Sequence, residues 1–199
     1  MNHKIGFIGL GLIGGSIARA VRQYFPDYEI VAFDKNKETL ALATQESVID
    51  VAATTIDDNF RNCRYLFLCA PVSYNTAYLR QIREYLHDDC ILTDVGSVKT
   101  NIHKEVEALG IERYFIGGHP MAGSEKSGYI NSRAMLIENA YFVLTPTNKV
   151  SVEKIARYEK FVQDLHAIPV LLDHQEHDYV TGTISHLPHI IASSLVNFV

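Results

Sequence analysis

The 199-residue sequence has no tryptophan, three cysteines and six prolines. It also has no apolar run of the ~20 residues that a bilayer-spanning helix needs. Cys63, Cys69 and Cys90 are odd in number and lack metal or redox spacing, so we expect reduced, buried thiols. Positive charge is not in excess, because 18 Lys and Arg stand against 23 Asp and Glu, a formal net charge of -5. These absences argue against a nucleic-acid or membrane partner and predict a cytoplasmic protein of one large domain, or of one domain and a piece of another.

A glycine-rich turn near the N-terminus organises the sequence. An apolar run over residues 4–8 leads into Gly9-Leu10-Gly11-Leu12-Ile13-Gly14, a helical pattern follows, and a second β-branched run stops at Asp34. This is the order of a dinucleotide-binding βαβ unit. A glycine-rich hairpin lacks the flanking strand and helix, and a secretory signal peptide would need a cleavage region. The pattern therefore favours dinucleotide binding.

The residues of this turn have separate expected roles. Gly9 permits the tight turn, Gly11 leaves room for a pyrophosphate against the backbone, and Gly14 lets the helix lie close to the strand. The backbone N–H groups at the helix start, where Leu12 and Ile13 lie, suit a phosphate, as does the positive end of the helix dipole.

Asp34 indicates which dinucleotide is bound. A carboxylate at the end of the second strand can accept hydrogen bonds from both hydroxyls of the adenosine ribose, and it repels a 2′-phosphate. Lys35 and Lys37 leave NADP as the alternative, because a nearby cation can hold that phosphate. The charge of Asp34 favours NAD.

Strand and helix patterns alternate along most of the remaining chain. This alternation predicts an α/β fold with a Rossmann-type, doubly wound, mostly parallel sheet, whose ligands bind at the carboxyl ends of the strands. Ala70 and Pro71, which follow a strand pattern, are therefore expected beside the cofactor. The predicted strands are 48–53, 65–69, 90–94, 114–117, 140–144 and 168–172, and the predicted helices are 37–44, 72–86, 100–109 and 151–165.

Two further segments complete the pattern. Residues 117–128 have four glycines and a proline among polar groups, which predicts a loop. Residues 175–199 form a long helical pattern broken near Pro188, with an apolar face that nothing in the sequence covers. We expect either a longer polypeptide or burial by a second subunit. The domains are predicted as 1–172, which binds the nucleotide, and 173–199, which begins a helical domain.

Chemically able side chains follow the predicted strands in three places. Ser97 lies in Asp94-Val95-Gly96-Ser97-Val98-Lys99, His119 lies in the glycine loop, and His186 and His189 lie in Ser185-His186-Leu187-Pro188-His189. Each has a structural alternative: Ser97 can cap the next helix, and His119 can bond to the backbone of its loop. The two C-terminal histidines could be a metal pair, but no third ligand stands at metal spacing, so we expect no metal.

These motifs together resemble the prephenate dehydrogenases, the cyclohexadienyl dehydrogenase family of tyrosine biosynthesis. The resemblance implies NAD-dependent oxidative decarboxylation of prephenate to 4-hydroxyphenylpyruvate. It also implies a homodimer built by C-terminal helices, and an arginine for a substrate carboxylate that no position here matches. The segments that carry it are Gly9 to Ser16, Asp94 to Lys99, Gly118-His119-Pro120-Met121-Ala122-Gly123-Ser124-Glu125 and Ser185 to His189.

The resemblance also implies roles for single residues. His119 matches the catalytic histidine that hydrogen-bonds the ring hydroxyl, and Ser97 matches the serine that holds this hydroxyl and the imidazole beside the cofactor. His189 matches a substrate-contacting histidine, with His186 on the same helix face. Ser124 and Glu125 match a loop that lines the pocket. An imidazole, with its usual pKa near ~6.5, is suited to accept the hydroxyl proton.

Three other functions stay open at this point. The enzyme could act on arogenate as well as, or in place of, prephenate. A β-hydroxyacid dehydrogenase would share the nucleotide fold and the long helix, but it needs a catalytic lysine for which the sequence offers no convincing candidate. The chain could also be an NAD-binding subunit or fragment without turnover.

Overall fold

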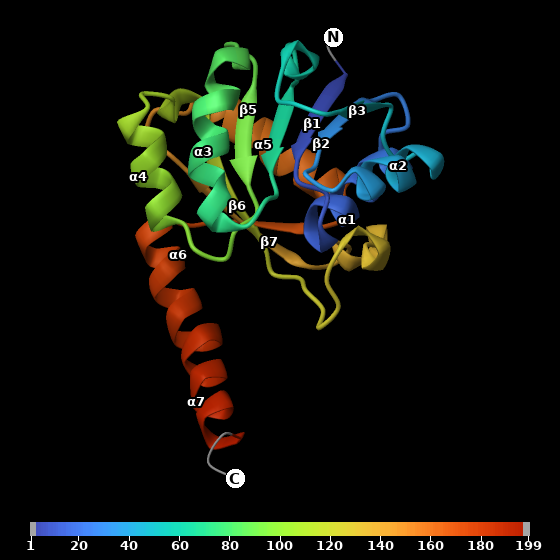
Figure 1. Ribbon diagram of the computed structural model, residues 1–199. Helices are drawn as coiled ribbons and strands as arrows, with labels where there is room; N and C mark the ends of the chain where they lie inside the picture. The colour runs from blue at the N-terminus through green and yellow to red at the C-terminus, as the bar shows by residue number, and fades with distance from the viewer. Residues whose placement is uncertain (1–2, 197–199) are drawn as a thin grey trace.

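The computed structural model describes residues 3–196, apart from the side chains of His186 and His189. Its first five strands form a parallel sheet in the order β3-β2-β1-β4-β5, with helices connecting the strands (Figure 1). The predicted doubly wound α/β fold is confirmed. The strands are β1 (Lys4–Ile8), β2 (Glu29–Phe33), β3 (Val51–Ala53), β4 (Tyr65–Leu68) and β5 (Ile91–Asp94), and the helices are α1 (Leu12–Tyr24), α2 (Lys37–Gln45), α3 (Val72–Ile82) and α4 (Thr100–Ala108).

A second sheet continues from the edge of the first. Its order is β6-β7-β8, with β7 antiparallel to β6 and parallel to β8, so the whole is mostly parallel as predicted. A single parallel bridge, Leu92 to Phe115, joins β5 to the segment before β6. The elements of this half are β6 (Ile116–Pro120), β7 (Tyr141–Pro146), α5 (Val152–Asp164) and β8 (Ile168–Leu171).

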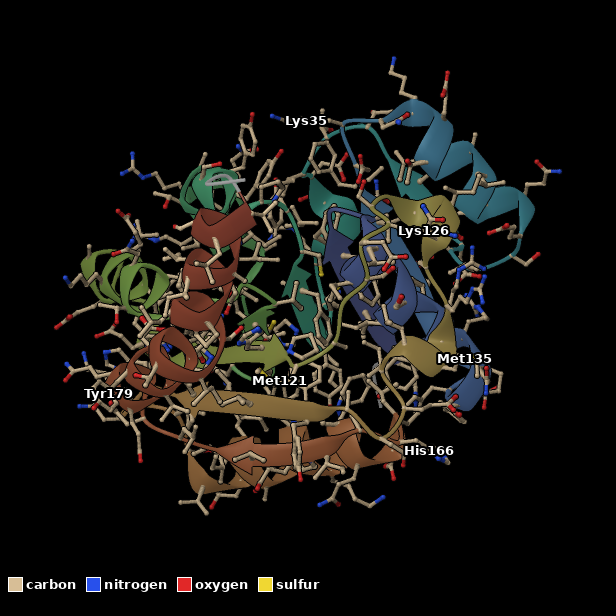
Figure 2. All side chains as sticks on the ribbon, turned by 90° about the horizontal axis from the view of Figure 1, so that it is seen from below. Lys35, Met121, Lys126, Met135, His166 and Tyr179 are labelled. Carbon is tan, nitrogen blue, oxygen red and sulfur yellow. The ribbon has the colours of Figure 1, made fainter. Side chains whose placement is uncertain are left out.

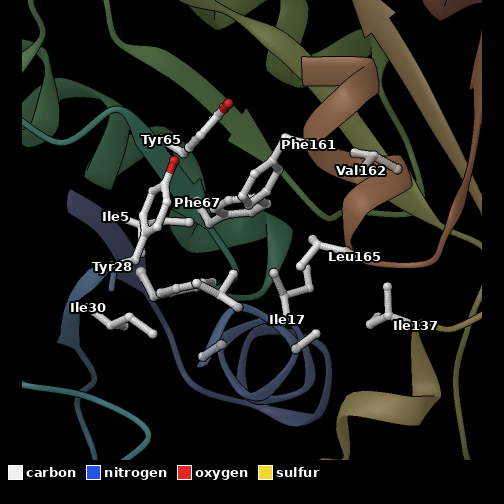
Figure 3. Close-up of a cluster of buried hydrophobic side chains, with 14 of the residues drawn as sticks. Ile5, Ile17, Tyr28, Ile30, Tyr65, Phe67, Ile137, Phe161, Val162 and Leu165 are labelled. Carbon is white, nitrogen blue, oxygen red and sulfur yellow. The ribbon is translucent and has the colours of Figure 1, made fainter. Parts of the chain in front are cut away.

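The first sheet is buried on both faces, which explains why its central strands are continuously apolar. On one face α1 and α5 pack against the sheet, where the ring of Phe67 stacks on Phe7 at 5.2 Å and Tyr65 stacks on Phe161 at 4.2 Å between centroids (Figure 3). On the other face α3 and α4 cover a second cluster, which contains Leu66. The rigid core thus fixes the carboxyl ends of β1, β4 and β5 relative to one another.

The predicted loop over residues 117–128 is wrong in its first part, because residues 117–120 belong to strand β6. Its glycines serve close packing and not a turn. A Cβ on Gly117 would lie 2.3 Å from the Thr145 hydroxyl oxygen, and one on Gly118 would lie 2.5 Å from the Asp94 carbonyl oxygen. Pro120 is tolerated because it ends the strand. His119 is therefore held on a sheet.

The C-terminal helical pattern is one rod with an altered turn. It consists of α6 (His174–Thr181), a π-helical turn (Gly182–His186) and α7 (Leu187–Val196), and it projects away from the body of the molecule (Figure 1). The break predicted near Pro188 takes the form of this π turn. Proline has no N–H for the carbonyl four residues before it, and a wider turn accommodates the mismatch. No helix within residues 3–196 is both long and apolar enough to cross a bilayer.

Candidate active site

The glycine motif forms a tight crevice between the ends of β1 and β4. Gly9 has a φ of +99°, and a Cβ there would lie 2.8 Å from the Ala70 backbone nitrogen. A Cβ on Gly14 would lie 2.4 Å from the Gly9 carbonyl oxygen. Both positions therefore require glycine, one for its backbone conformation and both for the approach of neighbouring backbone. A Cβ on Gly11 would meet nothing within 4 Å, so the space there is open.

The start of α1 is arranged to receive an anion. Gly11 is its N-cap and supplies no side-chain hydrogen bond, and the first turn holds no acidic side chain. The N–H groups of Leu12 and Ile13 thus lack the side-chain partner that usually satisfies a helix start. The open space at Gly11 and these N–H groups fit the pyrophosphate of a dinucleotide.

Asp34 lies beside this helix start with both carboxylate oxygens oriented by backbone. Its Oδ2 accepts a hydrogen bond from the N–H of Leu10 at 2.7 Å, and its Oδ1 accepts one from Asn36 at 2.8 Å. The Lys35 ammonium sits over the ring of Tyr74, 3.9 Å from its centroid. A cavity of about 290 Å³ opens here, lined by Gly9, Gly11, Phe33, Asp34, Lys35, Cys69, Ala70, Pro71, Tyr74 and Tyr78.

A buried ion pair holds the strand that carries His119. Asp94, at the end of β5, pairs with the ammonium of Lys99, and both side chains are almost fully buried. The pair forms hydrogen bonds with both backbone groups of Gly118. The Gly118 N–H donates to Asp94 Oδ1 at 3.2 Å, and Lys99 Nζ donates to the Gly118 carbonyl at 2.7 Å. Burial lowers the pKa of Lys99, and the charge of Asp94 opposes this. This ion pair therefore fixes the backbone immediately before His119.

His119 is linked to a second histidine that the sequence analysis missed. Its Nδ1 lies 2.8 Å from Nε2 of His177, a residue of α6 with 1% of its surface exposed. His177 Nδ1 lies 2.8 Å from Oδ1 of Asp178. Asp178 also accepts hydrogen bonds from the N–H groups of Lys99 at 2.7 Å and Thr100 at 2.8 Å. One chain of contacts thus joins β6, α6 and the start of α4.

The charge of Asp178 is stabilised by these contacts. Burial raises the pKa of its carboxyl, but hydrogen bonds from Thr100, from the Lys99 backbone and from His177 outweigh it and bring the pKa to about 2. Asp178 also caps α4, whose own N-cap residue makes no side-chain hydrogen bond. The sequence analysis gave capping of this helix as the alternative role of Ser97. Ser97 itself is exposed on the loop after β5. This loop lies at the carboxyl end of β5, at the same edge of the sheet as the carboxyl end of β6.

The structure separates the other predicted residues into two groups. Ser124 and Glu125 line a cavity of about 350 Å³ together with Leu12 of the glycine motif and Arg133. Their loop runs from Met121, just after β6, past Lys126 toward α1 (Figure 2). They thus lie beside the helix start and not in the contacts from His119 to Asp178. The predicted roles of His186 and His189 fall on side chains outside the described residues.

Metal binding has no support in the described part of the chain, where no three His, Cys, Asp or Glu side chains could together hold an ion. Lys99 is the nearest match to the lysine that a β-hydroxyacid dehydrogenase needs. Its ammonium is buried against Asp94 and Gly118, however, so it supports the backbone.

The sequence gave little sign of the roles of His177 and Asp178. Their only sequence signal was their adjacency, because His177 lies 58 positions from His119.

The fold and site define a class: a Rossmann-type, dinucleotide-binding α/β protein with a histidine site at the carboxyl edge of its sheet. Comparison with protein families narrows this class. Residues 17–171 match the family model described as "Prephenate dehydrogenase, nucleotide-binding domain", and residues 173–199 match "Prephenate dehydrogenase, dimerization domain". The chain belongs to the prephenate dehydrogenase family.

Individual relatives agree. The chain is 40% identical to a prephenate dehydrogenase of Lactococcus lactis, over 97% of this chain and 53% of the relative. It is 35% identical to one of Bacillus subtilis, over 99% and 54%. This chain therefore spans about half the length of these curated relatives.

Solved structures give the same family. Prephenate dehydrogenase from Aquifex aeolicus, in complex with hydroxyphenyl propionate and NAD+, superposes with a TM-score of 0.91 at 31% identity, covering 98% of this chain and 68% of that one. Synechocystis arogenate dehydrogenase superposes with a TM-score of 0.88 at 31% identity and the same coverage.

Proposed function

We propose that this chain is the NAD-binding and catalytic-histidine part of a prephenate dehydrogenase, which converts prephenate to 4-hydroxyphenylpyruvate and carbon dioxide in tyrosine biosynthesis. The observation that carries the proposal is the placement of His119. It lies at the carboxyl edge of the sheet, gripped through Gly118 by a buried ion pair and backed by His177. Membership of the family and the NAD+ complex of the Aquifex relative support the choice of reaction and cofactor.

The cofactor residues follow from the crevice. Gly9, Gly11 and Gly14 shape it, the N–H groups of Leu12 and Ile13 would hold the pyrophosphate, and Asp34 would accept the ribose hydroxyls. Ala70 and Pro71 line the same cavity, and we propose that Ser97 lies near the nicotinamide end. When bound, NAD accepts the hydride from the ring carbon that bears the substrate hydroxyl.

His119 handles the proton in this proposal. As hydride leaves, positive charge develops on the ring carbon unless the hydroxyl proton is drawn away. The imidazole of His119 takes this proton through a hydrogen bond that Ser97 helps to orient, and returns it to the phenol oxygen after carbon dioxide has left. We propose that His189 and His186 contact the substrate and that Ser124 and Glu125 line the entrance to its pocket.

Turnover measurements test this function. We expect NADH to form with prephenate, weakly because no residue here matches the carboxylate-binding arginine implied by the family. We expect none with a 3-hydroxy acid. Arogenate is a second candidate substrate, favoured by the similarity to Synechocystis arogenate dehydrogenase. NADH formation with the 3-hydroxy acid alone would overturn the proposal, and NAD binding without turnover of any substrate would favour a non-catalytic NAD-binding role.

Replacing the proposed base gives a sharper test. His119→Asn should lower the turnover number by ~10²-fold or more, because a positioned general base contributes on that scale. NAD affinity should stay nearly unchanged, since the crevice at Gly9 to Gly14 is a separate set of contacts. Steady-state kinetics and calorimetric titration with NAD measure the two effects. Near-normal turnover in the variant would make His119 a structural residue.

We also propose a division at residue 172, with residues 1–172 binding NAD and 173–199 beginning a helical domain that forms a homodimer. The match of residues 173–199 to a dimerization domain and the apolar residues exposed along α7 support this arrangement. We propose a cytoplasmic location because Cys63, Cys69 and Cys90 are free thiols, as is usual in a reducing compartment.

A further inference from the structure

His177 lies directly against the proposed base, His119. It is buried, and each of its ring nitrogens faces a partner: Asp178 Oδ1 on one side and His119 Nδ1 on the other, both at 2.8 Å. The Thr181 hydroxyl lies farther away, at 3.4 Å from Nε2. A buried imidazole with two short contacts has its proton positions dictated by those partners.

The partners specify one tautomer for each histidine. Asp178 is ionised and accepts hydrogen bonds from two backbone N–H groups, so it can only accept from His177 as well. His177 must then carry its proton on Nδ1 and offer the Nε2 lone pair. His119 in turn must donate from Nδ1, which leaves the lone pair on its Nε2.

We propose that His177 and Asp178 are positioning residues, which hold His119 in the Nδ1–H tautomer so that its Nε2 can accept a proton. The inference rests on the proposed role of His119 and names the residues that prepare it. When Nε2 of His119 takes a proton, the hydrogen bond that its Nδ1–H donates to His177 strengthens. The negative charge of Asp178, on the far side of His177, stabilises the resulting imidazolium. The arrangement resembles the aspartate and histidine of a catalytic triad, with one further histidine interposed.

Lys99 and His103, two ionisable residues at the start of α4, have partners of their own. On the α4 side, the Lys99 ammonium is neutralised by Asp94 and donates to the Gly118 carbonyl. His103 bonds to Thr145 and stacks on His174 at 4.3 Å between ring centroids. The carboxylate in contact with His177 is that of Asp178, at 2.8 Å from Nδ1.

The tautomers can be read without any turnover. Nitrogen-15 chemical shifts of the imidazoles distinguish protonated from unprotonated ring nitrogens, with His119→Asn and His177→Gln spectra assigning the signals. We expect the unsubstituted protein at neutral pH to show both His119 and His177 protonated on Nδ1. A His119 signal protonated on Nε2 would overturn the inference, whether or not prephenate is a substrate.

Asp178→Asn should disturb this arrangement. In Asp178, Oδ1 accepts from the Lys99 N–H and from His177, and Oδ2 accepts from the Thr100 N–H. An asparagine can therefore keep its oxygen on only one of these two sides. If its NH2 faces His177 Nδ1, the protons of His177 and His119 move to Nε2; if its oxygen faces His177, the tautomers stay but the negative charge is lost. We expect turnover to fall by ~10-fold or more in either case. Unchanged turnover in this folded variant would overturn the inference.

Asp173→Asn is the matched control. Asp173 caps α6 through the N–H groups of Gln175 and Glu176, as Asp178 caps α4. It meets His177 through its backbone carbonyl, which accepts the His177 N–H at 2.8 Å and which the substitution leaves in place. We expect it to leave the tautomers and turnover unchanged. If Asp178→Asn fails to fold, His177→Leu and His177→Gln replace it, because only the glutamine can accept from His119 Nδ1. Turnover that is higher in His177→Gln than in His177→Leu supports positioning, and equal turnover in the two contradicts it.

Discussion

Asp34 illustrates how one side chain is prepared for a ligand by its own backbone. Hydrogen bonds from the N–H groups of Leu10 and Asn36 orient its two oxygens at the rim of the crevice. Each carboxylate oxygen can accept more than one hydrogen bond, so this orientation leaves capacity for a ribose diol. The Lys35 ammonium, the alternative partner for a 2′-phosphate, lies over Tyr74.

We predict that NAD binds at least about tenfold more tightly than NADP, a difference of ~1.4 kcal/mol. The reason is that Asp34 meets a neutral diol in one ligand and a phosphate dianion in the other. Asp34→Ala should narrow the ratio, mainly by removing the repulsion of NADP. Calorimetric titrations with both nucleotides measure this, and equal affinities in the unsubstituted protein would contradict the assignment.

His103 couples stability to pH. It is buried, its Nε2 lies 2.9 Å from the Thr145 hydroxyl, and burial followed by the charges of His174 and Lys99 lowers its pKa from 6.5 to about 4. A pKa below the unfolded value means that the unfolded chain binds the proton more readily. The folded state therefore loses stability as the pH falls from 6.5 toward 4.

We predict that His103 contributes roughly 2–3 kcal/mol to this acid-induced loss, since each pKa unit corresponds to about 1.4 kcal/mol. His103→Gln keeps a hydrogen-bonding side chain for Thr145 and cannot be protonated. Urea unfolding at pH 7 and pH 4.5 should show a smaller loss of stability in the variant than in the unsubstituted protein. Equal losses in the two proteins would mean that folding does not lower the pKa of His103.

At the scale of elements, the glycines around the start of α1 differ in what requires them. Gly14 is required by the fold, because a Cβ there would meet the Gly9 carbonyl at 2.4 Å and Cys69 Cβ at 2.7 Å. Gly11 has ordinary helical-cap backbone angles and open space around its missing Cβ. Its need for glycine therefore comes from the ligand.

The two substitutions should separate folding from binding. Gly14→Ala should lower the free energy of unfolding by ~1–3 kcal/mol through overpacking. Gly11→Ala should leave the free energy of unfolding within ~0.5 kcal/mol of the unsubstituted protein, because nothing is displaced in the ligand-free state. NAD affinity should nevertheless fall about tenfold or more. Urea unfolding and calorimetry measure the two quantities, and unchanged affinity in Gly11→Ala would place the pyrophosphate elsewhere.

At the scale of the whole molecule, a compact two-sheet body carries a projecting helical rod (Figure 1). The large apolar side chains of the rod from Ile184 onward are between 51% and 75% exposed, and nothing within residues 3–196 covers them. Burying such a side chain is worth ~1.5–3 kcal/mol, so the exposed set is a strong drive for association. These residues are Ile184, Leu187, Ile190, Ile191, Leu195 and Val196.

We predict that the chain self-associates through this rod, with the rod of a second subunit covering it by symmetric pairing. Ile191→Glu should shift the protein toward monomer by placing a charge in the apolar face. Val152→Glu is the control, since Val152 is 77% exposed on α5, away from the rod. Light scattering across micromolar concentrations measures the mass, and a monomer throughout that range would contradict the pairing.

The sequence by itself determined the fold class and the nucleotide crevice. Both depend on local patterns: strand, glycine turn and helix follow one another within 34 residues, and apolar runs mark strands buried on both faces. The family resemblance was equally readable, because its motifs are short and contiguous. The proposed roles of Ser97, His189 and the loop at Ser124 remain predictions that came from this resemblance.

Only the tertiary structure decided how His119 is held. Its contacts join residues that are distant in sequence: His177 lies 58 positions away, and Asp178 lies 79 positions from Lys99. The tertiary structure also decided the role of Gly117 and Gly118, because the glycine-rich composition around them predicted a loop. Packing against Thr145 and Asp94 needs glycine in a strand, and no local pattern distinguishes that need from a turn. Periodicity reports which face of an element is buried, whereas hydrogen-bonded side chains depend on which elements the fold brings together.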